Sequence, residues 1–111
     1  MPQQSPLNQT QFLILLVLLD GPLHGYGIVK EIAARTDSGV RLEPGNLYRF
    51  VKRLMELGYI ADAPQARSDE SGRDARRRYF SLTRKGREAL EGDAARMRSL
   101  VLALESRQGN G

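Results

Sequence analysis

Apolar residues are densest in residues 12–19, where eight apolar positions follow one another. A membrane span needs about 20 such residues, so this run predicts a buried helix and not an anchor. Asn8, followed three residues later by Gln11, is typical of a capping box, and we expect the helix to run from Asn8 to Gly21-Pro22. Because the helix is apolar nearly all round, it needs either a central position or cover from a second subunit.

Helical spacing returns in residues 23–39, which predict a second helix with a stop at Ser38-Gly39. Residues 40–42 then predict a strand fragment, and Pro44 is suited to the first turn of another helix. The apolar positions of the second helix are Ile28, Val29, Ile32 and Ala33.

The most regular amphipathic pattern lies in residues 44–60 and predicts a third helix that Gly58 ends. Its apolar positions recur every three or four residues and form one buried stripe, while three cations fall on the opposite face. The stripe consists of Leu47, Phe50, Val51 and Leu54, and the opposite face carries Arg49, Lys52, Arg53 and Glu56.

Two stretches that depart from the helical period predict a β-hairpin. Residues 59–63 predict one strand, and residues 76–82 predict the other, with Phe80 and Leu82 on one face. The polar segment between them contains Pro, Ser, Gly and charges of both signs, which is typical of a connecting loop.

A last helix is expected after Thr83, whose hydroxyl can accept a hydrogen bond from a backbone N–H of the first turn. Its apolar residues form a heptad seam of about two heptads, which Gly92 weakens by roughly 1 kcal/mol. We expect the seam to pack against its counterpart in a second subunit, the alternative being cover of the monomer's own core. The expected dimer interface is Phe12, Leu16, Leu90, Ala94, Met97, Val101 and Leu104.

Composition limits the chemistry that the chain can perform. Its 111 residues suit one folding unit, with residues 1–83 and 84–107 as its two parts and 108–111 as a disordered tail. No cysteine is present and His24 is the single histidine, so we expect no metal, no cofactor and no catalytic set. His24 is expected to have a structural role at the entrance of the second helix. No secretion signal precedes or follows the apolar run, which indicates a cytoplasmic protein that does not bind a membrane.

Charge and element order together favour a DNA partner. The net charge of +4 permits an anionic partner without requiring one. Residues 76–87 contain six cations and no acid; such a run is usually a solvated face, but this one adjoins the hairpin and follows a helix with a cationic face. The predicted fold is a winged helix-turn-helix, mainly α with a small β-hairpin, in which the second helix of the motif enters the major groove.

Candidate DNA contacts follow from this arrangement. Arg49, near the start of the third helix, is the first candidate for a base edge, while Lys52 and Arg53 are expected at phosphates. For Tyr48 and Tyr26 the sequence favours half-buried packing over DNA contact, although both stay in the candidate set. Alternation along the strand allows at most two of the three consecutive wing arginines to matter strongly. The full set is Asn46, Tyr48, Arg49, Lys52 and Arg53 in the third helix, Tyr26 and Lys30 in the second, and Arg73, Arg76, Arg77, Arg78, Arg84 and Lys85 around the wing.

Three ordered blocks carry a family resemblance: LHGYGI at 23–28, PGNLYRFVKRLMELGYI at 44–60 and GRDARRRYFSLTRKGREAL at 72–90. They resemble the PadR-type transcriptional regulators, named after the phenolic acid decarboxylase regulator. The resemblance implies a homodimeric repressor of the short form, often responsive to a small aromatic or cationic effector near the dimer interface. Where the family usually has an acid, this chain has Gly27, whose low helix propensity predicts a later start of the second helix.

The leading prediction is therefore a dimeric, sequence-specific DNA-binding repressor on two half-sites of an inverted repeat, about one helical turn apart. The alternative is a winged-helix module that binds another protein through its first and last helices. An enzyme is not expected, because the sequence has no phosphate-binding glycine loop, no metal-ligand set and no nucleophile beside a base.

Overall fold

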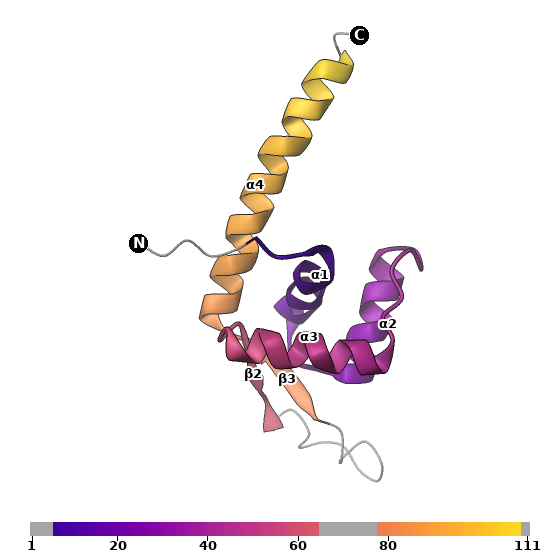
Figure 1. Cartoon of the computed structure of the whole chain (residues 1–111), viewed down its shortest axis with the longest axis vertical. Helices are drawn as coiled ribbons and strands as arrows, with labels where there is room; N and C mark the ends of the chain where they lie inside the picture. The colour runs from indigo at the N-terminus through magenta and orange to yellow at the C-terminus, as the bar shows by residue number, and fades with distance from the viewer. Residues whose placement is uncertain (1–5, 65–77, 110–111) are drawn as a thin grey trace.

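The fold is described from a computed structural model, in which residues 6–64 and 78–109 are placed (Figure 1). It is mainly helical with a small antiparallel sheet, as the sequence predicts. The first helices and the sheet form a body, and the last helix leaves this body as a long arm. In chain order the elements are α1 (Gln9–Val17), the 3-10 turn η1 (Leu18–Asp20), β1 (Leu23–His24), α2 (Gly25–Arg35), α3 (Pro44–Glu56), β2 (Ile60–Asp62), β3 (Tyr79–Leu82) and α4 (Arg84–Gly109).

α1 occupies the centre of the body, where α2, α3 and α4 all contact it. The predicted capping box is confirmed: Oδ1 of Asn8 accepts from the backbone N–H of Gln11 at 2.8 Å, and Oε1 of Gln11 accepts from the N–H of Asn8 at 3.0 Å. The neighbouring elements of the same chain bury most of the apolar run, so its hydrophobic character is largely explained within one protomer.

The sheet has the strand order β1-β3-β2 and is antiparallel. The predicted hairpin is confirmed, with Ile60 opposite Leu82 and Asp62 opposite Phe80. β1 is not predicted by the sequence, because two residues are too few to show alternation. It pairs with the other edge of β3, so Phe80 lies on the central strand and is fully buried.

Residues 40–42 form no strand, so the predicted strand fragment is wrong. The N–H of Val40 donates to the hydroxyl of Thr36 at 3.0 Å, which in turn donates to the carbonyl of Ile32 at 2.8 Å. These bonds hold the segment against the end of α2, and it contributes Leu42 to the core.

α2 differs from its prediction at both ends. It begins at Gly25 and not after Gly27, because Nδ1 of His24 accepts from the N–H of Gly27 at 3.0 Å and caps the helix. The expected structural role of His24 thus takes the form of a helix cap. α2 ends at Arg35, before the predicted stop, and the chain leaves it through Asp37 and Ser38, which have positive φ angles.

We expect the His24→Ala variant to lose about 1 kcal/mol of unfolding free energy, because the first turn of α2 loses its side-chain acceptor. His24→Asn is the matched control, since asparagine restores an acceptor at the cap but lacks the imidazole ring. Urea unfolding measures both variants. Equal destabilisation of the two would contradict the capping role and would point to the ring, whose centroid lies 5.1 Å from that of Tyr79.

α3 has the predicted two faces. Leu47, Val51 and Leu54 are buried, and the helix ends where Gly58 takes a φ of 81°. The N–H of Tyr59 returns to the carbonyl of Leu54 at 2.9 Å, which satisfies a carbonyl at the helix end. The last turn of α3 is therefore well fixed against the start of β2.

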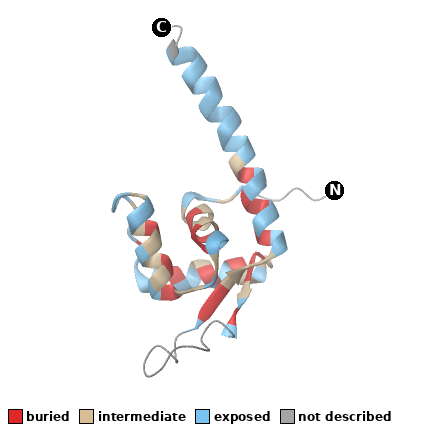
Figure 2. Cartoon of the chain, turned by 180° about the vertical axis from the view of Figure 1, so that it is seen from behind, coloured by how far each residue is buried: buried red, intermediate tan, exposed pale blue. Residues whose placement is uncertain are grey.

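α4 projects far beyond the body. The radius of gyration is 16.0 Å, whereas a compact domain of this length has about 13 Å. Residues 95–108 are exposed throughout, as the outer part of the arm shows (Figure 2). Within residues 6–64 and 78–109, no helix combines the length and the apolar character needed to cross a bilayer.

Candidate nucleic-acid interface

The outward face of α3 carries the five candidate residues of the third helix, and all of them are exposed. Burial of the apolar stripe on the opposite side leaves these positions facing solvent. This face is cationic, because it carries Arg49 and, one turn later, Lys52 and Arg53, with Glu56 as an acid at its end. Arg53 lies 3.6 Å from Glu56, so part of its charge is compensated.

Arg49 is held by a neighbour on its own helix. Its Nη2 donates to Oδ1 of Asn46 at 2.6 Å, one turn towards the helix start. Such a contact restricts the rotamers of a long side chain. Asn46 therefore makes a contact with Arg49 that spacing alone did not suggest.

Tyr48 and Tyr26 are both largely exposed, at 53% and 60%. The sequence favours half-buried packing for both, whereas the structure leaves more than half of each side chain exposed. Tyr48 lies over the start of α2, because a Cβ on Gly25 would stand 3.5 Å from its hydroxyl. Nζ of Lys30 lies 5.5 Å from the centroid of Tyr26, which groups the two candidates of α2.

Only some of the candidate wing arginines lie among the residues that the structure describes. Arg73, Arg76 and Arg77 lie outside the described residues. Arg78 is described, and its guanidinium contacts Asp62 across the hairpin at 2.6 and 3.1 Å. This hydrogen bond lowers the pKa of Asp62 and raises that of Arg78, so both groups stay charged. Arg78 thus has a partner within the chain, which sequence reasoning missed because 16 positions separate the two residues.

The cations that begin α4 also have intramolecular contacts. Arg84 lies 3.6 Å from Glu88, one turn along the helix, but keeps nearly all of its side chain exposed. Nζ of Lys85 lies 5.8 Å from the centroid of Tyr59. The Arg84–Glu88 pair is exposed and therefore weak, so the guanidinium of Arg84 stays accessible.

The residues expected at a dimer interface are not equally available. Leu90 is buried in the core of its own protomer, and Phe12 and Leu16 are half-buried against the same core. Met97, Val101 and Leu104 are exposed, and Ala94 is intermediate. Helical spacing could not show where along α4 the monomer core ends, and the dimer interface stays a prediction.

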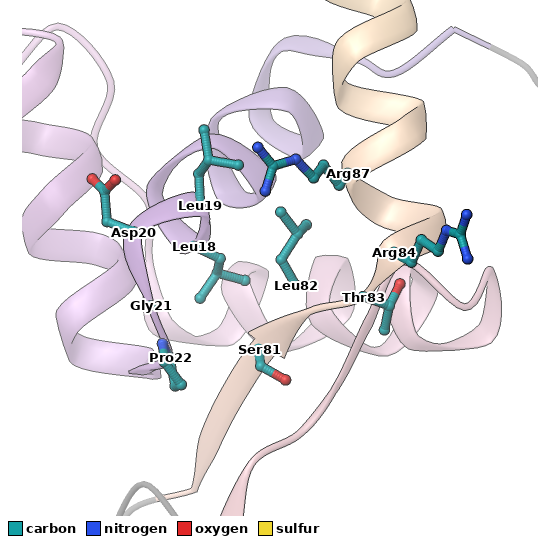
Figure 3. A pocket seen from close by; sticks show the side chains of 10 residues that line it. All are labelled: Leu18, Leu19, Asp20, Gly21, Pro22, Ser81, Leu82, Thr83, Arg84 and Arg87. Carbon is teal, nitrogen blue, oxygen red and sulfur yellow. The ribbon is translucent and has the colours of Figure 1, made fainter.

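A hollow of about 410 Å³ lies between η1, the end of β3 and the first turns of α4 (Figure 3). Leu18 and Leu82 line its apolar part, and Arg87 extends over it towards Leu19. None of its lining residues is aromatic, so it offers no ring for a planar ligand to stack on.

Comparison with known proteins places this geometry among transcriptional regulators. The family model described as "Transcriptional regulator PadR-like family" matches residues 14–92. A PadR family transcription regulator from Clostridium difficile has a similar structure, with a TM-score of 0.74 and 26% identity over 91% of this chain and 99% of that chain. Bacillus subtilis PadR, solved in complex with operator DNA, shares the fold with a TM-score of 0.63 and 21% identity, over 77% of this chain and 47% of that chain.

A curated relative extends the comparison to sequence. An uncharacterized 37.1 kDa protein from a transposon of Streptomyces fradiae is 42% identical over 93 residues, which is 84% of this chain. The chain spans 24% of the length of that relative.

Proposed function

Because the chain belongs to the PadR-like family of transcriptional regulators, which are not enzymes, we propose that it is a sequence-specific DNA-binding repressor that acts as a homodimer. The observation that carries the proposal is the outward face of α3, where exposed cations and a tyrosine stand opposite a buried apolar stripe. Bacillus subtilis PadR, of the same fold, was solved with operator DNA. We extend that partner to this chain, with α3 in the major groove.

Contacts of two kinds are proposed within this interface. Arg49, oriented by Asn46, reads a base edge, since a guanidinium fork matches the two acceptors of guanine. Lys52 and Arg53 meet phosphates, which fix the register without carrying sequence information. Tyr26 and Lys30 of α2 and the wing cations extend the phosphate contacts on either side of α3.

Dimerisation is proposed to occur through the α4 seam, here defined as the exposed residues Met97, Val101 and Leu104. They are spaced by four and three positions and lie on one side of the helix. Burial of one such side chain contributes about 1.5–3 kcal/mol. A two-fold dimer presents two α3 helices to an inverted repeat, with half-sites about 34 Å apart.

Repression follows if the dimer occupies DNA that polymerase needs. We propose in addition that a small effector bound near the dimer interface releases the operator by changing the orientation of one protomer relative to the other. The hollow at the first turns of α4, which precedes the seam along the helix, would place such a molecule against both α4 and the body.

The experiment that tests the proposal is a fluorescence-anisotropy titration. The purified protein is titrated against the duplex upstream of its own gene and against a scrambled duplex, at about 50 and 200 mM salt. We expect a preference above about a hundredfold for the upstream duplex and a steep loss of affinity in the higher salt. Equal, weak binding to both duplexes would contradict autoregulation through this site and leave only general electrostatic attraction.

We expect Arg49→Ala to weaken operator binding by about 1–3 kcal/mol and to relax the preference at one base pair, because one bidentate base contact is lost. Lys52→Ala is the control on the same face. It should weaken binding to all sequences alike and reduce the salt slope by about 1. Anisotropy against a panel of single-base operator variants measures both effects. An Arg49→Ala protein with unchanged affinity and base preference would refute the proposed readout.

A further inference from the structure

Thr83 hydrogen-bonds the start of α4 to the end of α3. Its hydroxyl donates to the carbonyl of Gly58 at 2.6 Å and accepts from the backbone N–H of Gly86 at 3.0 Å. Its backbone N–H donates to the carbonyl of Tyr59 at 3.0 Å. Thr83 therefore caps α4 and, with the same side chain, holds the turn that ends α3.

The connection is tight on both sides. Gly58 and Tyr59 belong to the closed turn at the end of α3, and Tyr59 is buried. Gly86 packs directly on this turn, because a Cβ there would overlap the carbonyl oxygen of Tyr59 and lie 2.9 Å from Cδ1 of Leu82. Little room is left for α4 to slide or turn at this point.

A second contact fixes the direction of α4. Asp93 is 6% exposed, and its carboxylate accepts from the backbone N–H of Leu7 at 3.1 Å and from Arg96. Leu90, one turn earlier, is buried against the body. α4 is thus held at its base and again along its side, and both contacts set its angle to α3.

Resting on the proposed dimer, we propose that Thr83, through its hydrogen bond to Gly58, is a positioning residue that sets which spacing of operator half-sites the protein accepts. If the α4 helices of two protomers pair, the separation of the two α3 helices follows from the angle between α3 and α4. One base pair changes the half-site separation by about 3.4 Å and rotates it by roughly 35°. A rigid connection accepts one spacing, whereas a loosened connection accepts several.

Three variants separate the two tasks of Thr83. Thr83→Val keeps the shape but has no hydroxyl, so it loses both side-chain hydrogen bonds. Thr83→Asp can accept from Gly86 and cap α4, but a carboxylate cannot donate to Gly58. Thr83→Ser keeps both bonds and is the conservative control. Circular dichroism melts establish that each variant is folded.

The probe is a duplex series derived from the inverted repeat that the wild-type protein enriches most strongly from a random library. The spacer is lengthened and shortened by one and two base pairs, and a duplex with one half-site is included. We expect wild type and Thr83→Ser to bind the duplex with the best spacing at least about tenfold more tightly than duplexes whose spacer is one base pair longer or shorter. A tenfold difference is about the effect of losing one good base contact. Thr83→Val and Thr83→Asp should bind all spacings within about threefold, with unchanged affinity for the single half-site.

Each other outcome has a definite meaning. If Thr83→Val and Thr83→Asp keep the wild-type spacing profile, the positioning role is refuted. If only Thr83→Asp keeps it, the cap of α4 and not the tie to Gly58 matters, which also refutes the proposal. A wild-type protein without any spacing preference would instead overturn dimeric operator binding itself, and this result is visible before any variant is made.

Discussion

Gly86→Ala should reduce the unfolding free energy by about 3 kcal/mol or more, at the upper end of the cost of overpacking. The added methyl group would meet the backbone carbonyl of Tyr59, which is fixed by its hydrogen bond from Thr83 and cannot rotate away as a flexible side chain could. Alanine's higher helix propensity offsets only about 1 kcal/mol of this cost. Since the unfolding free energy of a small domain is about 5–15 kcal/mol, this substitution would remove a large part of it.

Gly92→Ala is the matched control on the same helix. A Cβ at Gly92 would meet no atom within 4 Å beyond the adjoining backbone of its own helix, so the substitution adds helix propensity without a clash. We expect it to stabilise the protein by about 0.5–1 kcal/mol. Urea unfolding of both variants should therefore give effects of opposite sign. A mild effect of Gly86→Ala, similar to that of Gly92→Ala, would mean that α4 can shift on the α3 turn.

Local signals in the sequence predicted most of the helices, because the caps and stops at the helix ends are formed by residues close together in the chain. The Asn8 capping box, the Gly58 stop and the Thr83 cap all depend on residues within three or four positions. The predicted start of α2 is wrong because the cap from His24 outweighs the low helix propensity of Gly27. A histidine is not a usual cap, so only the geometry revealed its role.

Long-range features could not be read in the same way. Pairing of β1 with β3 joins segments more than fifty positions apart, and two residues carry no period of their own. The Arg78 and Asp62 contact depends on the hairpin register. For the candidate site, the periodicity of α3 was sufficient to predict which side chains are exposed, whereas the contact of Arg49 with Asn46 needed coordinates. That these residues bind DNA stays a prediction.

The exposed α4 seam gives the second large effect, in Val101→Asp. Val101 is 50% exposed in the protomer, so a carboxylate there should not destabilise the monomer. In a dimer each protomer would bury one such charge and lose one apolar contact. A loss of about 2 kcal/mol at each of the two positions weakens association by roughly a thousandfold. We expect a monomer by analytical ultracentrifugation and loss of tight binding to the two-half-site duplex.

Ala103→Asp is the matched control for this variant. It adds the same charge two residues away, on the opposite side of α4, and Ala103 is exposed. It should leave dimerisation and operator affinity near wild type. The comparison then shows that the effect of Val101→Asp depends on where the charge lies on α4 and not merely on adding a charge. If Val101→Asp stays dimeric and keeps full operator affinity, the seam does not mediate dimerisation and serves another purpose. Because the seam is apolar and projects beyond the body, that result would favour the alternative in which α4 binds a different protein.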